Sequence, residues 1–162
     1  MMAERTFAPW VEPIAAQLRQ GRAEIVELAH TIPGDAWRRQ SPLPGWTYKD
    51  VLGHLAVGDW VCQTVLRSVV EDRPFDMGIL AELDARNARY REERLNTTVE
   101  RLIAEAEAEG EETQDLLAQL NDAEEKRQQA DAPMGLAEYL RMFPSHDQEH
   151  LAHLGAAREA AR

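Results

Sequence analysis

The sequence predicts an all-α protein, and three observations lead to this prediction. Apolar residues recur at intervals of three, four and seven along most of the chain, which is the period of a helix with one buried face. No sustained apolar–polar alternation, the pattern of strands, interrupts that period. The chain has 162 residues, about one average domain, so we expect a single core over residues 1–162.

The first two long helices are predicted on either side of a loop. The apolar face of the first consists of Val11, Ile14, Leu18, Ile25 and Leu28, and the helix ends before Pro33-Gly34. The loop QSPLPGW (40–46) follows. Thr47 then has the character of an N-cap, with Asp50 in the third position of a weak capping box. The second helix runs from there to about Val70 and ends at Arg73-Pro74.

The second half of the chain predicts a long connection and two more helices. Residues 71–97 form the connection between the second and third long helices, and they contain a helix from about Ile79 to Arg94. The third long helix begins near Thr97 or Thr98 and continues to Leu120; its acidic stretch EAEAEGEE is a solvated face with a weak point at Gly110. A loop over 121–134, containing Pro133, precedes the last helix. That helix begins near Leu136, and Pro144 predicts either a kink or a restart at Ser145.

Four amphipathic helices of this kind pack as a four-helix bundle. The connection between the second and third helices has some 25 residues, which is long enough to cross the bundle, so these two helices can run parallel.

The composition excludes several classes of partner. Lys and Arg total 18 against 29 Asp and Glu, a net charge of −11, and the basic residues are scattered. DNA, RNA and anionic membranes are therefore not expected as partners. The lone Cys62 cannot form an intrachain disulfide. With neither a signal-peptide pattern at the N-terminus nor an apolar run long enough for a span, the sequence predicts a cytoplasmic protein.

Five histidines offer the clearest chemistry: His30, His54, His146, His150 and His153. His146 and His150 are one helical turn apart and can reach one metal ion, as can His150 and His153. His146 and His153 lie about 10 Å apart along a helix, too far to share an ion easily. His54, between Gly53 and Gly58 on a core-facing stripe, is the candidate third ligand of a site with three protein ligands. The alternative interpretation is a set of satisfied core histidines. His30 is most simply a favourable charge at a helix C-terminus.

Three stretches resemble the DinB/YfiT-like superfamily, which includes the N-terminal domains of mycothiol-dependent maleylpyruvate isomerases. The first is PGWTYKDVLGHLAVGDW (44–60), which carries Trp46, Thr47, Asp50, Val51, Leu52, His54 and Leu55. The second is HDQEHLAHL (146–154), with His146, His150 and Leu151 in an HxxxHL segment, and the third is LDARNARYREER (83–94), with Asn87. The resemblance covers nearly the whole chain. It implies an up-down-down-up bundle, a homodimer and a divalent metal on His54, His146 and His150, with His153 beside the site or on the surface.

The resemblance further implies a metal-dependent enzyme. Characterised members are thiol-dependent S-transferases and isomerases, or hydrolases, so we expect a small electrophilic substrate and a low-molecular-weight thiol as a candidate co-substrate. Three imidazoles suit Zn²⁺ first and Ni²⁺ second. The alternative is a non-catalytic module for structural metal binding, dimerisation or stress response.

Other residues complete the predicted site. Candidates for lining the pocket are Trp46, Asp59, Trp60, Asn87, Tyr90 and Met142. The alternative for each is ordinary packing in the core or at its rim, and this alternative is favoured for the aromatic residues and Met142. Asp59 lies about 140° round the helix from His54 and is also expected to face solvent. Asp147 and Glu149 are expected at the surface rather than as a general base. Cys62 is expected to be a small buried hydrophobe, not a nucleophile.

Overall fold

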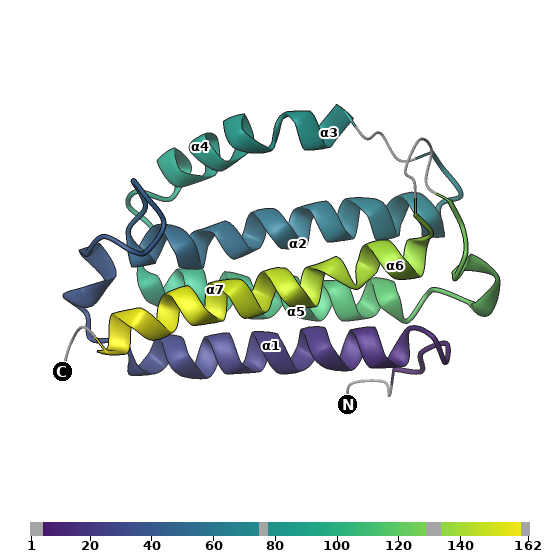
Figure 1. The fold of residues 1–162 in the computed structure, drawn as a ribbon, viewed down its shortest axis with the longest axis horizontal. Coiled ribbons are helices and arrows are strands. Elements are labelled where there is room, and N and C mark those ends of the chain that lie inside the picture. The colour runs from purple at the N-terminus through teal and green to yellow at the C-terminus, as the bar shows by residue number, and fades with distance from the viewer. Residues whose placement is uncertain (1–4, 75–77, 129–133, 160–162) are drawn as a thin grey trace.

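The computed structural model describes residues 5–74, 78–128 and 134–159, and within these ranges the regular structure is helical (Figure 1). The long helices are α1 (Glu12–Thr31), α2 (Tyr48–Val70), α5 (Val99–Leu117) and α7 (Met142–Glu159). Short helices α3 (Gly78–Ala81) and α4 (Leu83–Glu93) occupy the connection between α2 and α5, α6 (Leu136–Leu140) precedes α7, and 3₁₀ turns cover Ala36–Arg38 and Asp122–Glu124. The all-α prediction is confirmed. Pro133, assigned to a loop, lies outside the described residues.

The four long helices pack side by side. α1 and α2 each contact both α5 and α7. In Figure 1 the colour gradient runs in one direction along α1 and α7 and in the opposite direction along α2 and α5. The crossover carries α3 and α4 along the outer side of α2, and α4 contacts α2. Within the part of the chain that the structure describes, no helix is long and apolar enough to cross a bilayer.

Local signals start the helices at the predicted places. Thr47 accepts a hydrogen bond from the Asp50 backbone N–H at 3.2 Å, and the Asp50 carboxylate accepts one from the Thr47 N–H at 2.8 Å. This reciprocal pair is the predicted capping box, and it begins α2. Thr98, one of the two predicted residues, caps α5 through the Arg101 N–H. α5 ends at Leu117, three residues before the predicted end at Leu120.

The interruption of the last helix lies upstream of its predicted position. α6 ends at Leu140 and α7 begins at Met142, so the restart at Ser145 is wrong. Proline has no N–H, and Pro144 therefore cannot bond the carbonyl four residues back, at Leu140. That missing bond coincides with the break and leaves Pro144 in the first turn of α7. The histidines that follow it lie on an unbroken helix.

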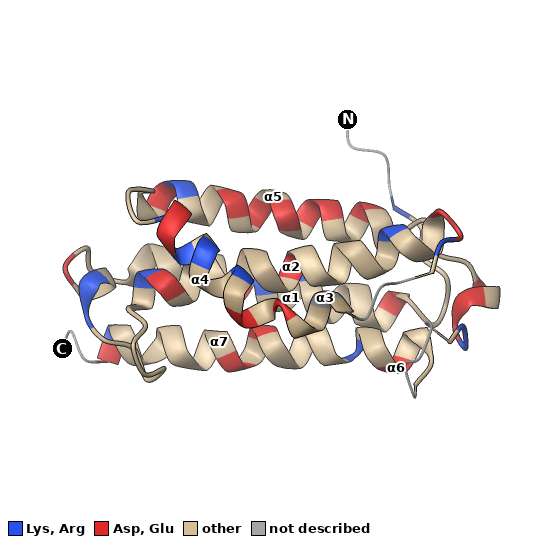
Figure 2. Ribbon diagram, turned by 90° about the horizontal axis from the view of Figure 1, so that it is seen from above, with Lys and Arg blue, Asp and Glu red and all other residues tan. Residues whose placement is uncertain are grey.

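The acidic stretch of α5 is a solvated face for most of its length. Figure 2 shows acidic residues along the outer side of this helix, and Glu107, Glu111 and Glu112 are exposed. Gly110 is more than a weak point, however. A Cβ on it would lie 3.1 Å from Cγ of Arg22, so the glycine lets the buried arginine pass close to α5.

Candidate metal centre

Three histidine side chains from two helices converge. α2 contributes His54, and α7 contributes His146 and His150 from successive turns. The Nε2 atoms of His54 and His146 are 3.3 Å apart, and those of His146 and His150 are 3.0 Å apart. One ligand atom from each residue lies within 4.8 Å of the other two. The structure thus brings together the three residues that the sequence singled out.

The geometry of this cluster fits a divalent ion. Nitrogen ligands about 2.0–2.1 Å from a tetrahedral Zn²⁺ are separated from each other by about 3.4 Å. The two measured Nε2 separations, 3.3 and 3.0 Å, are close to that value. Within the described residues the group has three members, and three protein ligands leave one tetrahedral position for another molecule.

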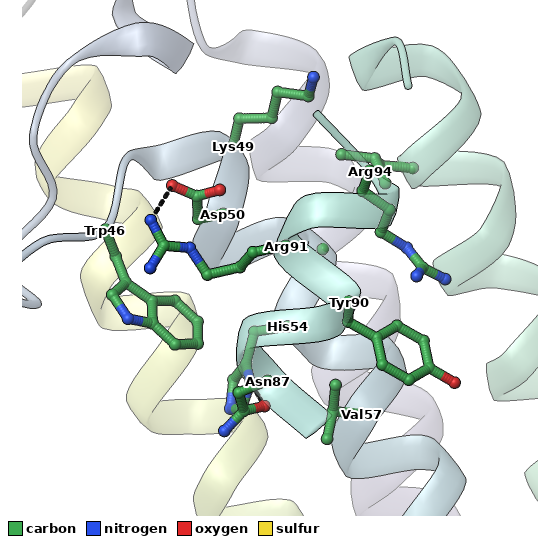
Figure 3. Close-up of a pocket in the computed structure, with 11 residues that line it drawn as sticks. Trp46, Lys49, Asp50, His54, Val57, Asn87, Tyr90, Arg91 and Arg94 are labelled. Atoms are coloured by element: carbon green, nitrogen blue, oxygen red, sulfur yellow. Dashed lines mark hydrogen bonds and ion pairs between the residues drawn. The ribbon is translucent and has the colours of Figure 1, made fainter. Parts of the chain in front are cut away.

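The orientation of the His54 ring is set by α4. Nδ1 of His54 lies 2.9 Å from Oδ1 of Asn87. An amide oxygen only accepts hydrogen bonds, so Nδ1 donates and the Nε2 lone pair of neutral His54 is directed at the cluster. Trp46 contacts the His54 ring edge-on, with centroids 4.9 Å apart (Figure 3). Asn87 and Trp46 therefore lie at the predicted site and hold one of its rings.

His153 lies on the far side of His150. The two Nδ1 atoms are 3.4 Å apart, whereas Nε2 of His150 faces the cluster. When that Nε2 presents a lone pair, the single proton of the neutral ring is on Nδ1 and is donated to His153. His153 is thus a neighbour of the candidate ligand and not part of the three-residue group.

Two histidines of the cluster, His54 and His150, are held in the neutral form. Burial, together with the neighbouring His146 ring, lowers the pKa of His54 from 6.5 to about 4. Burial and the charges of the other three rings lower the pKa of His150 to about 3. Neutral imidazole is the form that binds metals. At neutral pH, these two side chains therefore need not lose a proton before they bind an ion.

Gly58 makes room for His146. A Cβ on this glycine would lie 2.8 Å from Cε1 and 3.1 Å from Nδ1 of the imidazole, closer than real side-chain atoms approach. Gly53, on the other side of His54, gives space to Arg94 and Leu102 at ordinary contact distances. Both glycines leave room for a neighbouring side chain, and at Gly58 that side chain is a candidate ligand.

The remaining residues predicted to line the pocket are divided between several places. Tyr90, with Trp46 and Asn87, lines a recess of about 20 Å³ beside His54, shown in Figure 3. Met142 lines a larger chamber that also borders His54. Trp60 is in neither lining; the Arg86 guanidinium covers its ring at 3.5 Å.

The prediction for Asp59 is wrong. It is buried, does not line either cavity beside His54, and is paired through both oxygens with Arg22, at 2.7 and 2.8 Å. Asp147, also expected at the surface, is buried and lies 3.5 Å from the same guanidinium. The two carboxylates share one guanidinium, and burial raises the pKa of Asp59 to about 6 although Arg22 opposes this. Burial works against the charge on Arg22 as well, but the two carboxylates outweigh it and raise its pKa.

Sequence reasoning missed Arg22, although a signal existed. Leu18, Arg22 and Ile25 follow the helical spacing of the apolar face, so a charge occupies a core position. Such a charge requires a buried partner. The two nearby carboxylates belong to α2 and α7, and the cluster therefore joins α1 to both helices that carry the histidines.

Three other residues lie in the places expected for them. Cys62 is 2% exposed within an apolar core cluster, and burial raises the pKa of its thiol well above the ordinary value. A thiol of this kind stays protonated and is not a nucleophile. His30 lies in the last turn of α1, and Glu149 is exposed.

Comparison with known proteins agrees with this geometry. The profile of the DinB superfamily matches residues 17–154. Two uncharacterized proteins of Mycobacterium tuberculosis, MT0041 (strain CDC 1551) and Rv0036c (strain H37Rv), are each 32% identical over 63 residues, which is 39% of this chain and 23% of theirs. The chain therefore matches about a quarter of the length of these relatives. No solved structure matches it significantly.

The fold and the cluster together define an all-helical protein with a three-histidine group that can hold a metal ion. The chain belongs to the DinB superfamily, as the profile match over most of its length shows.

Proposed function

We propose that this protein is a metal-dependent enzyme whose ion is held by His54, His146 and His150. The observation that carries the proposal is the convergence of three imidazoles. Nε2 of His146 lies 3.3 Å from Nε2 of His54 and 3.0 Å from Nε2 of His150, and among the described residues the group has three members, with ligand atoms within 4.8 Å of one another. Structural zinc sites are normally closed by four protein ligands, whereas catalytic sites keep a position open. The group found here matches the second kind.

The nature of the ligands favours Zn²⁺, with Ni²⁺ as the second candidate, since borderline ions of this type prefer imidazole. An ion held in this way would supply Lewis acidity toward the oxygen or sulfur of a bound molecule. The chain's own residues do the rest. Asn87 fixes the tautomer and angle of His54, and His153 does the same for His150.

The proposed reaction is a transfer, isomerisation or hydrolysis at a small electrophilic molecule, with a low-molecular-weight thiol as a candidate co-substrate. Membership of the DinB superfamily supports this range of reactions. The net charge of −11 argues against nucleic acid as the substrate. We further propose a single domain over residues 1–162, an up-down-down-up four-helix bundle as its scaffold, a homodimer and a cytoplasmic location.

A second candidate is a non-catalytic metal-binding, dimerisation or stress-response module. It is favoured by one observation: α2 and α7 are joined through the histidine cluster, so an ion there could also tie the bundle together. The two functions differ in what metal removal does. A structural ion contributes to folding, and its chelation would lower the melting temperature steeply. The enzyme proposal expects chelation to leave the bundle folded, because two apolar core clusters exist apart from the site.

The first experiment is elemental analysis of tag-free protein alongside His54→Ala and His30→Ala. His30 is an exposed histidine outside the cluster and serves as the matched control. The proposal expects about one zinc or nickel per chain in the parent and in His30→Ala, and none in His54→Ala. A parent that contains no metal, and takes up none on reconstitution, would refute it.

A further inference from the structure

An apolar chamber borders the histidine cluster. Its volume is about 250 Å³, and His54 and His146 form part of its wall. The rest of the wall is contributed by three regions: α2, α4 and the junction of α6 with α7. Its apolar members are Val57, Val61, Leu83, Tyr139, Met142 and Phe143.

The charge of the wall limits what can bind there. Among the residues that the structure describes, none that lines the chamber is Asp, Glu, Lys or Arg, although 29% of the chain is charged. An ionic group placed against the apolar part of the wall, away from the histidines, would lose its hydration without gaining a partner of opposite charge among the described lining residues, which is unfavourable. The chamber therefore suits an uncharged, apolar group.

The volume limits the size of that group. Apolar cavities of about 150 Å³ bind benzene, and pockets for drug-sized molecules begin near 300 Å³. At about 250 Å³ the chamber holds one substituted ring or a branched alkyl group of similar size.

The wall is largely formed in advance. Tyr139 and Phe143, one turn apart across the break between the two helices, pack edge to face with centroids 5.6 Å apart. Met142 lies between them in the sequence and is 55% exposed, and methionine adapts its shape easily to different apolar groups. The three residues at the junction of α6 and α7 thus line the chamber, and they come shortly before His146 in the sequence.

We propose that this chamber binds the apolar part of the substrate, a group the size of one ring, while the reacting atom of the substrate lies at the three histidines. This assignment rests on the proposed metal site, because it uses the ion to place the reacting end. It narrows the substrate class to small molecules with an uncharged apolar group next to the reactive centre.

A pair of metal-binding probes tests the proposal. Benzohydroxamate and acetohydroxamate share a head that binds metals and differ in a phenyl against a methyl group. On zinc-loaded protein, calorimetry is expected to show that benzohydroxamate binds about 10- to 100-fold more tightly, the gain from burying a ring. Leu83→Trp and Met142→Trp, which fill the chamber, should remove most of this preference and leave acetohydroxamate binding unchanged. Met142 is exposed, so its variant should fold even where the Leu83 variant does not.

The matched control is Leu95→Trp, an addition of the same ring at a leucine that is 67% exposed and outside the chamber wall. It should keep the preference. Equal binding of the two probes to zinc-loaded parent, or a preference that survives in Met142→Trp, would overturn the chamber assignment while leaving the metal site standing. A parent that fails to take up zinc would instead refute the proposed function, and the chamber assignment with it.

Discussion

Replacing Gly58 with alanine should damage the proposed metal site without removing any of its three histidines. The new Cβ would lie 2.8 Å from Cε1 of His146, whereas two carbons are at their optimum near 3.5 Å or beyond. The imidazole must therefore retreat by about 0.7 Å. Metal–ligand distances tolerate only about ±0.2 Å, so the retreat takes Nε2 of His146 out of reach of an ion shared with the other two rings.

The same substitution should not harm the fold. Alanine is favoured over glycine inside a helix by about 1 kcal/mol. The His146 side chain is 31% exposed and can swing toward solvent without repacking the core. We expect Gly58→Ala to unfold at the parental temperature or slightly above it, and to bind zinc at least about tenfold more weakly.

A competition titration against a chelator measures the zinc affinity, and circular dichroism measures the melting temperature. Gly155→Ala is the control, since it makes the same change within α7 at a position where a Cβ meets nothing within 4 Å. If Gly58→Ala binds zinc as tightly as Gly155→Ala, the argument from the position of His146 is wrong.

Three further predictions follow from the surroundings of the site. Asn87→Ala should weaken zinc binding by about 10- to 100-fold in the same titration, because His54 loses the acceptor of its Nδ1 proton, whereas Asn96→Ala, at an exposed position, should not. Arg22→Met should lower the free energy of unfolding in urea by about 3–5 kcal/mol, because two buried carboxylates lose their partner; Arg19→Met, an exposed change on the same helix, should have little effect, and similar costs for both would count against the buried cluster. Between about pH 4 and 6.5 the unfolded chain binds a proton at His54 that the folded chain does not, so the stability of metal-free parent relative to His54→Asn should rise with pH across this window, by up to about 3 kcal/mol. A difference that does not change with pH in urea titrations would contradict the low pKa of His54.

The parts of the fold that depend on neighbouring residues could be predicted from the sequence. Thr47 and Asp50, three residues apart, predict the start of α2, and the structure shows both hydrogen bonds of the capping box that they form. The restart of the last helix, expected at Ser145, lies three residues earlier, at Met142. Proline interrupts the hydrogen bond to the carbonyl one turn earlier, so its effect is felt upstream of the residue itself.

The candidate site also has a part that neighbouring residues predict and a part that depends on how the helices pack. His146 and His150 are one turn apart, and a helix alone brings them together. The core-facing position of His54 makes it a candidate third ligand, but the resemblance is what favours a metal over a set of satisfied core histidines, because no local rule reports which face of α2 meets α7. Asp59 was misjudged for this reason. Its angle from His54 on the helix was correctly estimated, but the side away from the histidines faces Arg22 of α1 and not water.

The packing of α4 has a consequence for how this protein can change. None of its residues is buried, yet it supplies Asn87 to the site and Leu83 to the chamber. Substitutions in residues 83–93 therefore cost little in stability and would act directly on the proposed metal site and chamber. Under the proposed function, stability and substrate choice are encoded in different segments, so natural drift or a laboratory library confined to α4 would test new substrates while the four long helices stay unchanged.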